Sequence, residues 1–260
     1  MCEYCLKHGD GKKWYENELN YSKKLFEEKE TQIAAKNYFS TTIKERKEGA
    51  KKRFDSNLKI LDSITQKKLE NHYANYLHHQ VVPLEDAVEV AKTATRTCKM
   101  ECVCRKIYGK SEGECIGLGF SVDFASQYPE YGAKEISVED LVDYLQELSQ
   151  NKIVHSVSAL RVPYVGMICN CNLRYCLPYR TRKKFGIKKA FYKAEYFFEI
   201  NKDKCSKCLK CLSMCQFGAL KHKKDVYIDR EKCFGCGLCR EACEEKAMEK
   251  RNREEFLLQW

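Results

Sequence analysis

Eight cysteines near the carboxyl-terminal end of the chain follow a regular spacing. They form two runs of the form Cys-x2-Cys-x2-Cys-x3-Cys, made of Cys205, Cys208, Cys211 and Cys215 and then of Cys233, Cys236, Cys239 and Cys243. The flanking residues repeat with them, because Glu199–Leu220 aligns with Tyr227–Met248 at a period of 28 residues. Steps of three residues bring three thiolates to one side of a tight loop, and the fourth cysteine then faces a second site. This chemistry suits a pair of cubane iron–sulfur clusters.

The stretch from Phe197 to Met248 closely resembles the bacterial-type ferredoxins that carry two [4Fe-4S] clusters. The resemblance implies that cluster 1 is held by Cys205, Cys208, Cys211 and Cys243, and cluster 2 by Cys233, Cys236, Cys239 and Cys215. The family usually has proline after the fourth cysteine, where this chain has Gln216 and Glu244. Proline supplies no ligand, so the departure leaves ligation intact. A zinc ribbon is the alternative for paired Cys-x2-Cys motifs, but the doubled four-cysteine runs favour two clusters.

A second group of cysteines lies in the middle of the chain. Cys98 precedes Cys102-x-Cys104, and Cys169-x-Cys171 follows much later, each pair being too tight to close one ligand loop. A third site would therefore draw on both segments, from a pool of Cys102, Cys104, Cys115, Cys169, Cys171 and Cys176. The segment resembles a cysteine-rich module found upstream of dicluster ferredoxin domains in redox proteins of anaerobes. The resemblance favours a third iron–sulfur centre, with a structural zinc or unligated buried thiols as alternatives.

Other candidate sites are weaker. Cys2-x2-Cys5-x2-His8 is a loose ligand set near the amino terminus. Cys98-x3-Cys102-x-Cys104 is one residue short of the radical-SAM spacing, and no strand–helix repeat follows it. His155 is expected to be a packed histidine, and Gly117-x-Gly119 lacks the helix-opening glycine of a nucleotide-binding loop.

Three stretches of chain must position these cysteines, which predicts an α+β protein. Residues 1–80 form a charged segment of amphipathic helices, broken near Ser40–Thr42 or at Gly49. Residues 81–190 form a small α/β cysteine-rich domain with helices starting at Pro83 and Ser137 and strands over 153–157 and 164–168. Residues 191–250 form a pseudo-two-fold dicluster ferredoxin fold, and 251–260 an apolar tail.

Composition narrows the class of protein. The 260 residues include 17 cysteines and carry a formal net charge of +10, and no run approaches the ~18 apolar residues of a membrane span. No secretory signal opens the chain, so we expect a cytoplasmic protein whose reduced cysteines bind metal. Two clusters would bring the charge to roughly +6. With basic and acidic side chains interleaved, nucleic acid is disfavoured, and the basic helices before residue 80 are the expected docking surface for a protein redox partner.

These observations together predict an iron–sulfur electron-transfer protein or subunit from an anaerobe. It would relay single low-potential electrons through two [4Fe-4S] clusters, with a possible third centre in the middle domain. One alternative is an iron–sulfur reductase whose middle cluster binds and reduces a substrate. The other is a redox-sensing or assembly factor. The sequence identifies no catalytic residue for either of these two alternatives.

Overall fold

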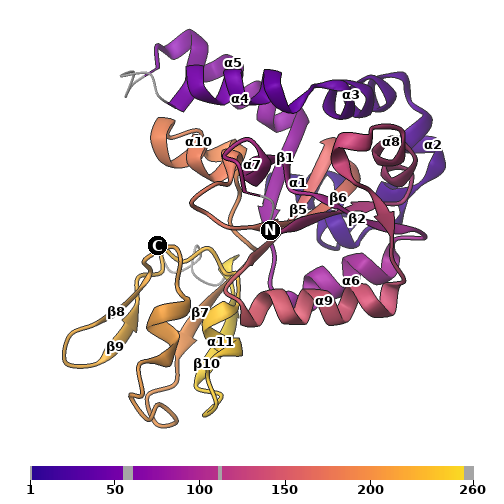
Figure 1. Cartoon of the computed structure of the whole chain (residues 1–260). Helices are drawn as coiled ribbons and strands as arrows, with labels where there is room; N and C mark the ends of the chain where they lie inside the picture. Colours follow the sequence, from indigo (N-terminus) through magenta and orange to yellow (C-terminus); the bar gives the residue numbers. More distant parts are fainter. Residues whose placement is uncertain (1, 55–60, 111–112, 255–260) are drawn as a thin grey trace.

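The chain is a mixed helix and strand protein built around one six-stranded sheet (Figure 1). The computed structural model describes residues 2–54, 61–110 and 113–254. The sheet has the order β1-β5-β6-β3-β2-β4 and all its described pairings are antiparallel. Its strands are β1 (Tyr76–Val81), β2 (Thr97–Glu101), β3 (Glu114–Leu118), β4 (Lys134–Glu135), β5 (Val154–Arg161) and β6 (Tyr164–Cys171).

Two interior strands, β5 and β6, begin close to the predicted positions and are longer than predicted. β5 and β6 pair from Val154 opposite Cys171 to Arg161 opposite Tyr164. Every residue of β6 is buried, since helices cover both faces of the sheet. The extension of β6 to Cys171 places the Cys169-x-Cys171 pair inside a strand.

Helices α6 (Leu84–Thr93) and α9 (Val138–Gln150) cover one face of the sheet (Figure 1). Both begin where the sequence predicts: Pro83 precedes α6, and the Ser137 hydroxyl accepts the Asp140 N–H at 3.1 Å. Their apolar stripes bury against the strands, in a core that includes Val90, Ala91, Leu141, Leu145, Ile116, Leu118, Val157 and Ile168.

The opposite face is covered by the amino-terminal helices and by short helices between strands. These are α2 (Lys23–Glu27), α3 (Lys29–Ser40), α4 (Ile43–Phe54), α5 (Ser63–Asn75), α7 (Val103–Lys106), α8 (Ser121–Gln127) and α10 (Leu177–Phe185). The predicted break near Ser40–Thr42 separates α3 from α4, whereas Gly49 lies inside α4. Directly after α5 the chain enters β1, which pairs with β5, so the end of the charged segment is a strand of the sheet.

Several short elements surround this three-layer body. Near the amino terminus are α1 (Glu3–His8), η1 (Trp14–Glu16) and η2 (Glu18–Tyr21). Two further single turns, η3 (Pro129–Tyr131) and η4 (Lys188–Ala190), lie between larger elements. No helix in the described ranges has both the length and the apolar character needed to cross a bilayer.

The carboxyl-terminal part forms a separate lobe at the lower left of Figure 1. It contains two small antiparallel pairs, β7 (Tyr196–Ile200) with β10 (Met248–Asn252) and β8 (Leu220–His222) with β9 (Val226–Ile228). Two turns of helix, η5 (Lys210–Met214) and α11 (Leu238–Glu241), follow the cysteine loops. The predicted apolar tail from Phe256 to Trp260 lies outside the described residues.

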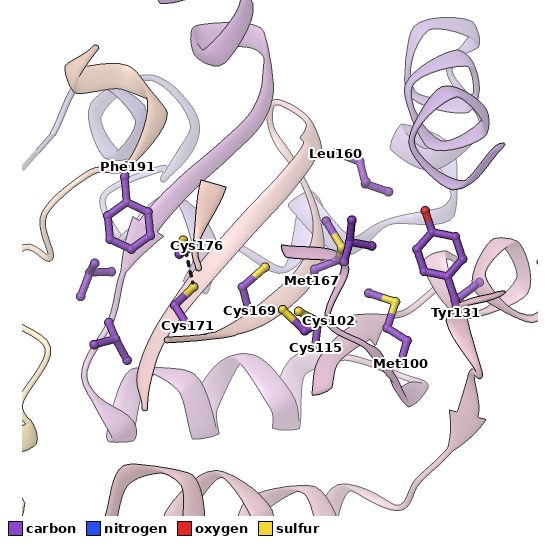
Figure 2. Close-up of a cluster of buried hydrophobic side chains, with 14 of the residues drawn as sticks. Met100, Cys102, Cys115, Tyr131, Leu160, Met167, Cys169, Cys171, Cys176 and Phe191 are labelled. Atoms are coloured by element: carbon purple, nitrogen blue, oxygen red, sulfur yellow. Dashed lines mark hydrogen bonds between the residues drawn. The ribbon is translucent and has the colours of Figure 1, made fainter. Parts of the chain in front are cut away.

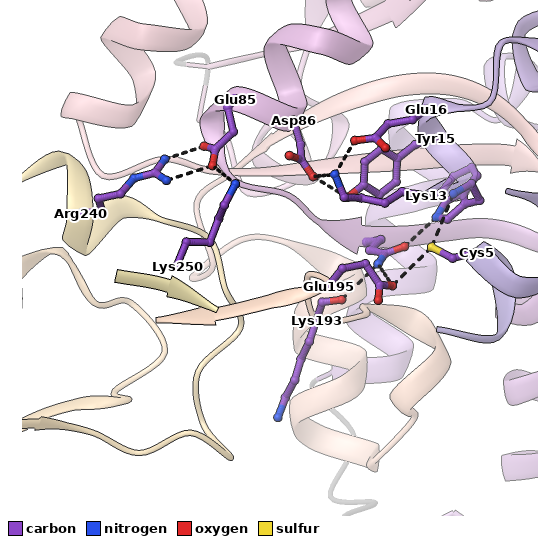
Figure 3. Close-up of polar contacts among 12 residues, drawn as sticks. Cys5, Lys13, Tyr15, Glu16, Glu85, Asp86, Lys193, Glu195, Arg240 and Lys250 are labelled. Carbon is purple, nitrogen blue, oxygen red and sulfur yellow. Dashed lines mark hydrogen bonds and ion pairs between the residues drawn. The ribbon is translucent and has the colours of Figure 1, made fainter. Parts of the chain in front are cut away.

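An ion-pair group joins this lobe to the sheet body. Glu85, in the first turn of α6, receives both ends of the Arg240 guanidinium at 2.9 and 2.5 Å and the Lys250 ammonium at 2.7 Å (Figure 3). Burial alone would raise the pKa of Glu85, but the hydrogen bonds from Arg240 and Lys250 outweigh it and lower the pKa to about 2. The folded protein therefore favours the charged carboxylate.

We predict a pH-dependent contribution from this group. Because the pKa of Glu85 falls from 4.5 to about 2 on folding, its stabilisation is complete above pH 4.5 and is lost as the pH falls toward 2. Glu85→Gln should lower the free energy of unfolding by ~1 kcal/mol at neutral pH, a value already reduced for partial exposure. Anaerobic denaturant titrations at successive pH values test this.

The matched control for that experiment is Glu89→Gln on the same helix. Glu89 pairs with Lys92 at 3.0 Å in an exposed position, so its change should stay within ~0.5 kcal/mol at every pH. A loss for Glu85→Gln that persists unchanged down to pH 3 would contradict the assigned role of the Glu85 carboxylate.

Candidate iron–sulfur centres

The two carboxyl-terminal cysteine loops have the same backbone conformation. Lys207 and Leu209 adopt positive φ values of 57° and 64°, and Gly235 and Gly237, 28 residues later, adopt 74° and 81°. The pair Gly218 and Lys246 shares the same feature, at 65° and 50°. Left-handed residues between cysteines make the chain curl tightly enough for successive sulfurs to face inward. The sequence repeat is therefore also a conformational repeat.

The loops bring the eight cysteines together in two sets of four. One cavity of about 20 Å³ is lined by Cys205, Cys208, Cys211 and Cys243, and another of about 20 Å³ by Cys215, Cys233, Cys236 and Cys239. Each cavity thus receives three sulfurs from one run and the fourth from the other. This crossed arrangement has the sulfur set that a cubane cluster requires.

Matching hydrogen bonds fix the two crossing cysteines. The Ala219 N–H donates to Cys215 Sγ at 3.2 Å, and the Ala247 N–H donates to Cys243 Sγ at 3.3 Å. The halves also exchange backbone bonds, Asn201 N–H to Ala247 carbonyl and Asp229 N–H to Ala219 carbonyl, both at 2.8 Å. Donors of this kind stabilise a thiolate ligand and set its direction.

The two residues that replace the usual proline make specific contacts. The Gln216 side chain accepts the Leu173 N–H at 3.5 Å and donates to the Lys152 carbonyl, so it connects the lobe to the sheet body. Glu244 pairs with Lys210 at 2.6 Å, while Lys207 pairs with Asp225 at 2.6 Å. The nearby charges of opposite sign are therefore largely neutralised by one another, which weakens their effect on a cluster potential.

Six middle cysteines line one larger cavity of about 240 Å³. They are all the members of the predicted pool: Cys102, Cys104, Cys115, Cys169, Cys171 and Cys176. Cys169 and Cys171 lie two residues apart on β6 and so face the same side of the sheet. Figure 2 shows the sulfurs of Cys102, Cys115 and Cys169 gathered in one group. Cys171 and Cys176 form a separate pair. The sulfurs of that pair lie 3.6 Å apart.

The thiols in this cavity perturb one another strongly. Hydrogen bonds from Cys104 and Cys115 hold the pKa of the Cys102 thiol well below its usual range. Cys104 and Cys115 each donate a hydrogen bond to Cys102, and this bond raises the pKa of both donor thiols. Burial raises the two pKa values further. Such close contact between buried sulfurs is typical of a metal-ligand set, whose binding would release the thiol protons.

Cys98 is the seventh middle cysteine, and it stays outside the cavity. It is fully buried on β2, and its sulfur lies 2.9 Å from where a Cβ on Gly117 would be. Cys98 therefore packs against the backbone of β3, which makes it a useful control residue.

Cationic side chains complete the cavity wall. Arg46 and Arg53 of α4 and Arg105 of α7 line it, and no carboxylate does so among the described residues. Arg105 is 6% exposed and donates to the Asn170 carbonyl at 3.0 Å. A wall of this charge suits an anionic occupant such as a thiolate-bound cluster.

The sequence does not predict the part of the cavity wall that α4, α5 and β1 form. Arg53, Tyr73 and His79 line it although they lie far from any cysteine motif in the sequence. No local spacing marks them, because Arg53 of α4 and Tyr73 of α5 meet the cysteines only when these helices pack on the sheet, and His79 only when β1 joins the sheet. His155, in contrast, is packed as expected, 2.8 Å from the Ser149 hydroxyl and 2.9 Å from Asn170 Oδ1.

Aromatic side chains connect α10, which begins at the middle cysteine Cys176, with the second carboxyl-terminal site. Phe217 and Phe234, which line that site, are stacked at 4.2 Å. Tyr179 packs edge-on against Phe217 at 5.6 Å and against Phe234 at 6.1 Å. Burial raises the pKa of Tyr179, with smaller contributions from Cys176 on one side and Cys215 on the other. Tyr179 therefore lies between the two cysteine sets.

Comparison with known proteins defines the class of the carboxyl-terminal lobe. Residues 198–221 and 226–249 match the 4Fe-4S binding domain family. These two motifs indicate two [4Fe-4S] clusters and a ferredoxin-type electron-transport protein.

A curated relative agrees with this class. The chain is 41% identical over 49 residues to the pyruvate synthase subunit PorD of Methanothermobacter marburgensis (strain Marburg). The alignment covers 19% of this chain and 58% of PorD, so the chain spans little more than half of that relative. No solved structure matches the chain.

The loop geometry predicts that Gly235 is essential for the second site. A Cβ on Gly235 would lie 2.2 Å from the Tyr196 carbonyl oxygen, and its φ of +74° is costly for any other residue, by ~1–2 kcal/mol. Gly235→Ala should displace the loop and lower the iron content by about four irons per chain. Iron and sulfide analysis after anaerobic purification measures this loss.

Gly186→Ala is the control for this substitution. Gly186 ends α10 with a φ of +71° and has nothing within 4 Å of an added Cβ, so alanine should leave the iron content unchanged and lower the free energy of unfolding by ~1–2 kcal/mol. Equal iron content in Gly235→Ala and the unmodified chain would show that the loop tolerates the shift.

Proposed function

We propose that this protein is an electron-transfer subunit with three iron–sulfur centres. Two are the [4Fe-4S] clusters of the carboxyl-terminal lobe, and the third lies among the six middle cysteines. The observation that carries the proposal is the convergence of six cysteines from separate segments on one cavity that three arginines also line. When bound, such clusters accept and release single electrons at low potential.

The ligand assignment for the lobe follows its crossed geometry. We assign Cys205, Cys208, Cys211 and Cys243 to cluster 1 and Cys233, Cys236, Cys239 and Cys215 to cluster 2, in support of which each set surrounds its own cavity. Burial raises the pKa of the Cys236 thiol to about 12. The thiol is therefore protonated at neutral pH without a cluster, and it must release this proton when it binds iron.

The third centre is proposed on charge and position. One cubane takes four thiolates and carries about −2 with them, a charge that Arg46, Arg53 and Arg105 would compensate. Tyr179 lies one helical turn after Cys176 and contacts Phe217 and Phe234, which line the cluster 2 site. This arrangement supports a relay from the middle centre through cluster 2 to cluster 1.

A reductase is the second candidate function, favoured by the size of the middle cavity. Its volume is about 240 Å³, against about 20 Å³ at each ferredoxin site. Six cysteines also exceed the four that one cubane uses. The extra room and the apolar wall of Phe54, Tyr73 and Leu77 would accommodate a small substrate beside the centre.

Domain layout and compartment belong to the same proposal. We infer that residues 191–250 form the ferredoxin unit and that residues 81–190 with the preceding helical segment carry the third centre. All 17 cysteines are free thiols, which agrees with a reducing compartment, and we propose the cytoplasm.

We predict about twelve irons per chain after anaerobic purification, with eight in the Cys104→Ser/Cys171→Ser variant. The EPR spectrum of the reduced protein should lose one component in this variant, because both cysteines line the middle cavity. Cys98→Ser, which changes a buried cysteine outside the cavity, should keep all twelve.

About eight irons in the unmodified chain, with or without one zinc, would refute the third cluster while leaving the ferredoxin clusters in place. A change of the third EPR component on addition of a small substrate would favour the reductase over the pure electron carrier.

The basic helices remain the proposed docking surface for a protein partner. Exposed lysines cluster on α4 and α5: Lys44, Lys47, Lys51, Lys52, Lys67 and Lys68. Because α4 also lines the middle cavity, a partner bound here would lie close to the proposed third centre. An acidic protein surface has the matching charge.

We predict that charge reversal on α4 weakens this docking. Lys47→Glu/Lys51→Glu/Lys52→Glu should lower the amount of partner co-purified from the source organism about tenfold at low salt, with a smaller salt dependence. The same reversal at Lys221, Lys223 and Lys224, exposed residues of the lobe, is the control. An equal loss for both variants would argue against a surface on α4.

A further inference from the structure

Two cysteines at the amino terminus meet a carboxylate from the segment that leads into the carboxyl-terminal lobe. Cys2 and Cys5 lie one turn apart at the start of α1, and Glu195 directly precedes β7. One ligand atom from each of these three side chains lies within 4.8 Å of the other two. His8, which the sequence suggests as a partner, lies instead against the Tyr4 ring.

The distances fit a tetrahedral metal ion. Cys2 Sγ lies 3.5 Å from Cys5 Sγ and 3.8 Å from Gln80 Oε1, and Cys5 Sγ lies 3.4 Å from Glu195 Oε1. Around zinc, with Zn–S of about 2.3 Å and Zn–O of about 2.0–2.2 Å, tetrahedral geometry places two sulfurs ~3.8 Å apart and sulfur and oxygen ~3.5 Å apart. All three measured separations agree with these values to within a few tenths of an ångström.

Surrounding groups hold the four side chains in place. Trp14 Nε1 donates to Gln80 Oε1 at 2.6 Å, and Gln80 Nε2 donates to Glu195 Oε1 at 2.9 Å. The Trp14 backbone N–H donates to Cys5 Sγ at 3.5 Å. Figure 3 shows Cys5 beside Glu195. Gln80 and Trp14 are fully buried and Cys5 is 1% exposed. A preformed set of donors in the second layer is typical of a metal site.

We propose that Cys2, Cys5, Glu195 and Gln80 Oε1 bind one zinc ion. Mixed thiolate and oxygen ligands in tetrahedral geometry favour zinc over the hard cations, which take oxygen ligands only. On binding, both thiols lose their protons, and the ion joins α1 to β1 and to the residues entering the ferredoxin lobe. Zinc has no redox chemistry, so this site is structural and independent of the electron-transfer proposal.

The test is metal analysis of the full chain purified without oxygen. We expect about one zinc per chain, and its loss in both Glu195→Gln and Cys2→Ser/Cys5→Ser, with iron and sulfide unchanged in each variant. Cys98→Ser, a buried cysteine elsewhere, should retain the zinc. If the third-cluster proposal fails and a zinc occupies the middle cavity instead, the total rises to about two, but the two variants should still lose one zinc each because they change only this site.

Zinc-edge X-ray absorption of the unmodified chain provides a measurement that needs no variant. Two sulfurs near 2.3 Å and two oxygens near 2.0–2.2 Å would support the site. Four sulfurs would place the zinc on vacated cluster cysteines and overturn the proposal. So would zinc content equal in all variants, or a Cys2–Cys5 disulfide found by mass spectrometry after thiol alkylation.

Discussion

The convergence of sulfur atoms is the constraint on which the rest of this structure depends. Thiols that converge from one short stretch of chain need backbone bent more sharply than a regular helix or strand allows. In the carboxyl-terminal lobe the bends are left-handed residues, glycine in one repeat and Lys207 and Leu209 in the other. The same conformation with different residues shows that the loop shape, rather than glycine itself, is what both halves share.

The middle cysteines converge by a different route. Their sulfurs come from the start of α7, from β3 and β6, and from the start of α10, so a sheet and its flanking helices bring them together. One wall of this cavity carries no cysteine, and residues of α4 and α5 form that wall. The lobe encloses its sites within one short stretch, whereas the sheet body leaves room beside its sulfurs.

Charge links the parts of the molecule. Glu85 receives Arg240 and Lys250 from the lobe, and the six middle thiols face three arginines. Near the lobe cysteines, lysines and carboxylates pair with each other instead. Basic side chains therefore have different surroundings in the two parts: Lys207 and Lys210 of the lobe form ion pairs, whereas three arginines line the middle cavity and lysines are exposed on α4.

The sequence by itself determined the local features. The 28-residue repeat, the starts of α6 and α9, and the division of the 17 cysteines into eight, seven and two were all readable from spacing, because helix caps and metal loops depend on residues close in the chain. Only the tertiary structure decided that β1 joins the sheet, that α4 and α5 close the middle cavity, and that Glu195 rather than His8 faces Cys2 and Cys5. These contacts join residues that are far apart in sequence, and they arise from packing the helices and the lobe against one sheet, which no local pattern encodes.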